Sequence, residues 1–85
     1  MNKREKVIFD SFNGNGWDVL HCGWPDFLLY KEKTNEAIFI EVKPIPTKYE
    51  LKHNKNMGGL LMPTQEKMHR VLKNLGLRVK VVHVE

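Results

Sequence analysis

The most restrictive feature of the chain is an apolar run at residues 37–43 that carries an acid and an amine near its end. The sequence of this run, Ala-Ile-Phe-Ile-Glu-Val-Lys, is typical of a β-strand. Glu41 and Lys43 are two positions apart, so in a strand their side chains point to the same face. A mostly buried strand therefore presents a carboxylate beside an ammonium group.

A second apolar run lies upstream, where Asp26 is followed by Phe-Leu-Leu-Tyr at residues 27–30. The polar stretch between the two runs, residues 31–36, predicts a hairpin turn centred on Thr34-Asn35. We therefore expect two antiparallel strands, at about residues 26–32 and 36–43.

The turn decides which residues face one another across this hairpin. If Lys33 pairs with Glu36, then Asp26 faces Lys43. Asp26 and Glu41 become diagonal neighbours on one face, roughly 7 Å apart between Cα atoms. Two carboxylates at that distance repel unless they are neutralised, and a divalent cation is the usual partner. The pattern predicts a metal site with an amine beside it. The alternative is that Glu41 and Lys43 lie on a solvated strand face.

The remaining segments predict a single α/β domain over residues 1–85, with elements in the order α-β-β-β-α-β. The other expected elements are a helix over 3–13, a short strand at 17–21, a polar loop from Pro44 to about Leu61, a helix from Pro63 with Thr64 as N-cap and Gly76 as its stop, and a strand at 77–84.

Length and composition limit the class of protein. A chain of 85 residues buries a modest core, so oligomerisation would add stability. A net charge of +4 fits a polyanionic partner. Cys22 is the only cysteine, and no apolar stretch approaches the roughly 20 residues of a membrane span. We expect a soluble cytoplasmic protein without a membrane partner.

Three segments together resemble the VRR-NUC branch of the PD-(D/E)XK nuclease superfamily, which includes relatives among the Holliday-junction resolvases. The segments are Gly23-Trp24-Pro25-Asp26-Phe27-Leu28-Leu29, Glu41-Val42-Lys43 and Leu61-Met62-Pro63-Thr64-Gln65, so the resemblance spans nearly the whole chain. It implies a restriction-endonuclease-like core, with a mixed sheet flanked by helices. It also implies metal-dependent hydrolysis of DNA phosphodiesters, with Holliday junctions, flaps or other branched DNA as substrate. A stand-alone domain of this size would act as a homodimer, because two sites are needed to cut two strands symmetrically.

The resemblance implies a set of site residues. The catalytic set is Asp26, Glu41, Lys43 and Gln65, and the metal ligands are Glu5, Asp26, Glu41 and Val42. Hard oxygen ligands favour one or two Mg²⁺ or Mn²⁺ ions over Zn²⁺. Lys43 acts either as general base or as a fixed charge that stabilises the phosphate.

Two of these assignments have plain alternatives. Glu5 shares the apolar side of the first helix, but it could also belong to a fraying turn that reaches solvent. Gln65 could instead bond free backbone amides in the first turn of its helix. The four histidines show no zinc spacing and are interpreted as surface or packing residues, although His69 follows Gln65 by four and could flank the site.

The loop after the second strand is basic. Lys48, Lys52 and Lys55 are expected to contact the DNA backbone, and Tyr49 among them could stack on a base or sugar, although such runs are often only solvated faces. No segment resembles a base-reading helix. The competing hypotheses are a catalytically silent nucleic-acid-binding module with the nuclease fold, and a small assembly protein.

Overall fold

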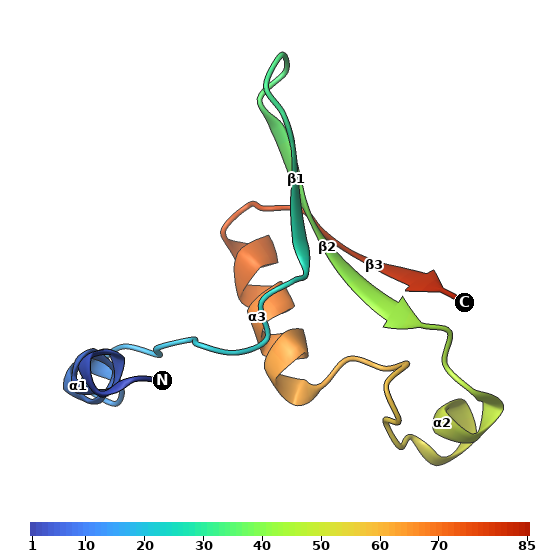
Figure 1. Cartoon of the computed structure of the whole chain (residues 1–85), viewed down its shortest axis with the longest axis horizontal. Coiled ribbons are helices and arrows are strands. Elements are labelled where there is room, and N and C mark those ends of the chain that lie inside the picture. Colours follow the sequence, from blue (N-terminus) through green and yellow to red (C-terminus); the bar gives the residue numbers. More distant parts are fainter.

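The computed structural model describes all residues 1–85 and contains three helices and three strands. In chain order these are α1 (Lys3–Phe12), β1 (Phe27–Lys31), β2 (Glu36–Pro44), α2 (Lys48–His53), α3 (Pro63–Asn74) and β3 (Val79–Val84). The strands form one sheet in the order β1-β2-β3, with β1 antiparallel and β3 parallel to β2, and α3 lies beside it (Figure 1). The prediction of a mixed sheet with helices is confirmed. None of the helices has both the length and the apolar composition needed to cross a membrane.

The predicted strand at residues 17–21 is wrong, and the element order is α-β-β-α-α-β rather than α-β-β-β-α-β. The only pairing near this segment is a single bridge between Asn13 and Trp17. The segment instead approaches α3, where Nζ of Lys67 donates to Oδ2 of Asp18 at 3.1 Å. It therefore has no strand edge beside it with which to form a ladder.

The start of α3 also differs from the prediction. Met62 is the N-cap and Pro63 occupies the first turn, so Thr64 lies inside the helix. Proline is favoured there because its fixed φ suits the helix and its missing N–H would have no partner. Oε1 of Gln65 accepts a hydrogen bond from the amide of Met62 at 2.9 Å, and this bond caps the start of the helix. The predicted stop at Gly76 is confirmed, since this residue follows the C-cap with φ +84°.

The hairpin turn is longer than predicted. Lys31 pairs with Glu36, so the predicted pairing of Lys33 with Glu36 is wrong and residues 32–35 form the turn. Asn35 adopts a left-handed conformation with φ +56°, which asparagine tolerates better than most residues. The hydroxyl of Tyr30 donates to Oδ1 of Asn35 at 2.8 Å, which ties the turn to the end of β1.

The segment predicted as a polar loop, residues 44–62, contains α2 and is organised around one buried acid. Glu50 accepts hydrogen bonds from the amides of Thr47 at 3.0 Å, Met57 at 2.8 Å and Gly59 at 3.0 Å. These bonds hold the pKa of Glu50 below its usual value, and the bond from the amide of Thr47 has the largest effect on it. Thr47 in turn accepts from the amide of Glu50 at 3.1 Å, which completes a capping box.

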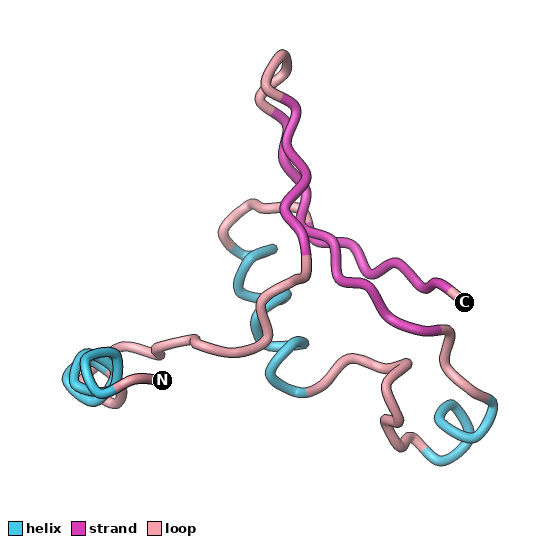
Figure 2. The backbone as a smooth tube through the Cα atoms, in the orientation of Figure 1, coloured by secondary structure: helices cyan, strands magenta, loops and turns pink.

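Only one face of the sheet is covered. Met68 and Leu72 of α3 are buried against it. The strand β1 extends beyond this cover, and side chains on both of its faces are more than half exposed, namely Phe27, Leu28, Leu29 and Tyr30. Helix α1 stands apart from the sheet (Figures 1 and 2), and none of its residues is buried. The predicted inward direction of its apolar stripe is therefore not found. The radius of gyration is 15.8 Å, against roughly 12 Å for a compact chain of this length.

Candidate active site

Asp26 and Glu41 lie closer together than predicted. The observed register pairs Phe27 with Ile40, and one further step places Asp26 opposite Glu41 rather than opposite Lys43. Directly opposed residues are about 4.5–5.5 Å apart, compared with roughly 7 Å for the predicted diagonal pair. Asp26 lies just outside β1, and its Oδ2 accepts from the amide of Val42 at 2.7 Å. The side chain thereby accepts a hydrogen bond from an amide of β2 at the end of the ladder, where β1 offers no further main-chain partner.

The position of Asp26 depends on a close approach between the preceding loop and α3. Gly23 has φ +88°, and a Cβ atom built on it would lie 2.3 Å from the carbonyl oxygen of Thr64. No other residue fits this contact without moving the helix. The chain is thus held against α3 immediately before it delivers Asp26 to the sheet.

Glu41 is the buried acid of this pair, with 2% of its surface exposed, whereas Asp26 is exposed. Burial, followed by the hydrogen bond and the negative charge of Asp26, raises the pKa of Glu41 to about 7, and the charge of Lys43 opposes the shift. The pKa of Asp26 is lowered, first by the hydrogen bond with Glu41 and then by the amide of Val42. The pair therefore shares a proton at moderate pH, with Glu41 as its holder.

His69 joins this pair from α3, which corresponds to the alternative that its spacing from Gln65 offered. Its side chain is buried, and its Nε2 lies 3.4 Å from Oε1 of Glu41. Burial lowers the pKa of His69, and the charges of Lys73 and Lys43 lower it further, so the ring is neutral near pH 7. The sequence interpretation of His69 as a packing residue is correct in that the side chain is buried, but the ring also contacts Glu41. Its helical spacing from Gln65 was the one signal in the sequence.

Lys43 lies on the same face of β2 as Glu41, two residues further along, and is paired across the sheet with His83 of β3. Its charge acts on both Asp26 and Glu41. The structure therefore brings together the two carboxylates and the amine that the sequence singled out.

Two other predicted residues are occupied elsewhere. Oε1 of Gln65 accepts from the amide of Met62, which is the alternative role of a first-turn residue. Glu5 is exposed on α1, where its Oε2 lies 3.5 Å from Nε2 of His21. The contacts of both side chains are local, and their assignment to the site stays a prediction.

The donor set fits an ion of the magnesium type. No group of three or more His, Cys, Asp or Glu side chains is arranged to hold a metal ion. Mg²⁺, however, is commonly bound by one or two carboxylates together with waters and substrate phosphates. Oε1 of Glu41 is buried and has no hydrogen-bond partner, which is the condition of a ligand atom awaiting a cation or a donor.

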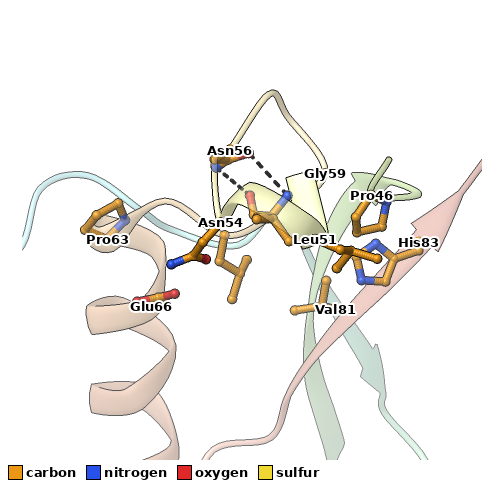
Figure 3. A pocket seen from close by; sticks show the side chains of 11 residues that line it. Pro46, Leu51, Asn54, Asn56, Gly59, Pro63, Glu66, Val81 and His83 are labelled. Atoms are coloured by element: carbon orange, nitrogen blue, oxygen red, sulfur yellow. Dashed lines mark hydrogen bonds between the residues drawn. The ribbon is translucent and has the colours of Figure 1, made fainter. Parts of the chain in front are cut away.

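A cavity of about 630 Å³ opens beside β3 (Figure 3). Val81 and His83 line it from β3, and they are the strand partners of Glu41 and Lys43. The other walls come from α3, where Glu66 lies, and from the segment that contains α2. The cavity thus lies between β3, α3 and the segment that contains α2, and neither the carboxylate pair nor Lys43 lines it.

The predicted DNA-binding residues are on or next to α2. Lys48, Tyr49 and Lys52 are exposed on the helix and Lys55 follows it. Lys48 and Lys52 are four residues apart and so share one side of the helix. The rings of Tyr49 and His53 are 4.5 Å apart at an angle of 44°.

No protein-family model matches the chain, and no curated protein or solved structure matches it either. The site is therefore interpreted from its own chemistry. It combines two opposed carboxylates that share a proton, an amine on the same strand face and a buried imidazole.

Proposed function

We propose that the chain is a metal-dependent endodeoxyribonuclease of the VRR-NUC branch of the PD-(D/E)XK superfamily. The observation that carries the proposal is the opposed pair of Asp26 and Glu41, with Lys43 on the same face of β2. A pair of carboxylates this close is costly without a counterion, and here Glu41 is also buried. Exchange of its proton for a divalent cation removes that cost.

In the proposed reaction, Asp26 and Glu41 hold one or two Mg²⁺ or Mn²⁺ ions, assisted by the main-chain carbonyl of Val42. A bound ion of this kind lowers the pKa of a coordinated water and clamps phosphate oxygens. Glu41 must first lose its proton, because only the carboxylate is a ligand. Lys43 then either accepts the proton of the attacking water or stabilises the negative charge on the phosphate.

The proposed substrate is DNA recognised by its shape, with Holliday junctions, flaps and other branched forms as the main candidates. The positive net charge and the exposed lysines of α2 support attraction to a phosphate backbone. The proposed path of the strand runs from the lysines of α2 towards Lys43.

A homodimer is part of the proposal. Two surfaces of the single chain are apolar and uncovered, namely the stripe of α1 and the sheet face that carries Phe27 and Leu29. Contact with a second copy would bury part of this surface, and a pair of sites would allow paired cuts in two strands. A monomeric mass by light scattering, with and without DNA, would contradict this part alone.

The alternative is a catalytically silent nucleic-acid-binding module with the same fold. Two contacts favour this alternative, namely that of Gln65 at the start of its own helix and that of Glu5 with His21. Both side chains have local partners, and a silent module needs neither of them in a catalytic site. The two functions differ in one measurable respect, which is metal-dependent cleavage.

The deciding experiment compares end-labelled linear, flap and four-way DNA. With Mg²⁺ or Mn²⁺ we expect cleavage of the branched forms in preference to linear duplex, and no cleavage with a chelator. Glu41→Gln serves as the control for contaminating nucleases. Salt-sensitive binding without any cut would establish the silent module instead.

We further expect the basic residues of α2 to contribute affinity without sequence preference. The triple change of Lys48, Lys52 and Lys55 to Ala should weaken binding of all DNA sequences about equally. The slope of log affinity against log salt should become shallower, by up to about 0.9 per lost phosphate contact. Fluorescence anisotropy over a salt series measures both effects.

The matched control removes the same charge from another surface. Lys31, Lys33 and Lys80 are exposed on the hairpin and the uncovered sheet face, away from α2. Their replacement by Ala should leave most of the slope intact. An equal loss in both triple variants would mean that net charge alone, rather than the α2 segment, governs binding.

A further inference from the structure

Besides the exposed Asp26, Glu41 meets a buried polar side chain, the imidazole of His69. Nε2 of His69 and Oε1 of Glu41 are 3.4 Å apart, and the two side chains are only 5% and 3% exposed. Neither atom has a hydrogen-bond partner elsewhere in the chain. Buried polar atoms without partners are rare because each costs free energy. Two such atoms that face each other at this distance are natural partners.

We propose that His69 is a positioning residue whose Nε2–H donates a hydrogen bond to Oε1 of Glu41 and so fixes the orientation of this carboxylate. A small closure of the present separation gives an ordinary N–H···O bond of about 2.9 Å. The inference rests on the proposed function, because an oriented Glu41 matters for activity only if it binds a metal ion.

The packing of α3 explains why His69 can hold this position. The helix buries Met68 and Leu72 against the sheet, and His69 lies between them in sequence and is buried with them. A ring fixed by packing places its donor with little loss of rotamer freedom. With Oε1 tied to His69, the second oxygen of Glu41 is left for the ion.

Donors behind a ligand carboxylate typically change metal affinity by about 10–100-fold. His69→Leu removes the donor, whereas His69→Gln retains an N–H group at a similar reach. We expect His69→Leu to weaken Mn²⁺ binding by about 10–100-fold and His69→Gln to remain close to the wild type. Calorimetric titration of the full chain with MnCl₂ at pH 8 measures the dissociation constants, and circular dichroism confirms that each variant is folded.

His53→Leu is the matched control, because it removes an exposed histidine of α2 and should leave Mn²⁺ binding unchanged. An unchanged affinity in His69→Leu, or equal losses in the Leu and Gln variants, would overturn the proposal. In the second case the shape of the residue would matter, and the donor would not.

A second measurement separates this inference from the nuclease proposal. In the metal-free protein, ¹⁵N NMR of the imidazole should show a proton on Nε2 of His69 whose signal moves in Glu41→Gln. An unprotonated Nε2 would overturn the role of His69 and leave the nuclease proposal standing. If the signal is present but the wild type binds no Mn²⁺, the nuclease proposal fails instead.

Discussion

Replacement of Glu41 by Gln is expected to reduce the rate of DNA cleavage by about 100-fold or more, through loss of charge that stabilises the transition state. The amide keeps the shape of the buried side chain but cannot serve as an anionic ligand. Asp26→Asn and Lys43→Ala should have effects of the same order, since each removes a charge from the same face of β2. Single-turnover cleavage of a labelled four-way junction with saturating Mg²⁺ measures all three rates.

These variants should remain folded, so the loss of rate should not be a loss of structure. Asp26→Asn retains an oxygen that can accept from the amide of Val42, and Glu41→Gln removes a charge that is unfavourable in its buried position. Far-UV circular dichroism and thermal melting provide the check. A variant that is folded and keeps near-full rate would remove its residue from the proposed catalytic set.

The second large effect is a pH-dependent exchange between proton and metal at Glu41. The pKa of Glu41 is about 7 in the folded chain, against an ordinary value of 4.5. The folded state therefore binds more protons than the unfolded state between these two values. The contribution of Glu41 to the free energy of unfolding is fully present below pH 4.5 and is lost as the pH rises through 7. Without metal, the wild type should lose this stability and Glu41→Gln should not.

Other groups change stability over neighbouring ranges, so the difference between wild type and Glu41→Gln is the quantity to measure. The lowered pKa of His69 acts in the opposite direction, because its contribution is lost as the pH falls through the ordinary value of 6.5. Asp26 and Glu50, with lowered pKa values, lose their contributions only at more acidic pH. The variant keeps Glu50, whose contribution cancels, so the difference reports on Glu41 together with its contacts Asp26 and His69.

Added Mn²⁺ should reverse the loss. Above pH 7 the deprotonated pair binds the ion, and binding to the native state alone raises the Tm by mass action. Near pH 5 the proton on Glu41 competes, so the increase should be small. Melting curves at several pH values, with and without MnCl₂, measure the effect. A Tm that does not respond to Mn²⁺ at pH 8 would contradict the metal site.

The sequence predicts the local elements well, since their signals are local. The apolar runs of β1 and β2, the stripe of α3 and the glycine stop at Gly76 all appear in the structure. Asp26, Glu41 and Lys43 could be selected because an acid and an amine two apart in an apolar strand are unusual. Glu41 and Lys43 share a face through strand periodicity alone, whereas the side of Asp26 also depends on the hairpin register.

The remaining differences have two kinds of cause. The predicted register was wrong for a local reason, because the turn takes four residues, with Asn35 in a left-handed conformation, instead of two. The strand at residues 17–21 fails because of a tertiary contact that no local pattern encodes, the approach of this segment to α3. The burial of His69 against Glu41 likewise depends on how α3 packs. Helix α2 is an exception, because its capping box at Thr47 and Glu50 was present in the sequence.

The four-residue turn of the hairpin has a consequence for how this gene can vary. Successive residues of β1 alternate between the two sides of the sheet, so the register that the turn sets decides on which side Asp26 emerges. Substitutions within residues 32–35 that keep the four-residue turn leave that register unchanged. If one codon of the turn were deleted and the new turn again took four residues, β1 would shift by one residue and Asp26 would turn away from Glu41, although every residue of the site would still be encoded. The spacing of the hairpin is thus as much a determinant of the site as the identities of its side chains.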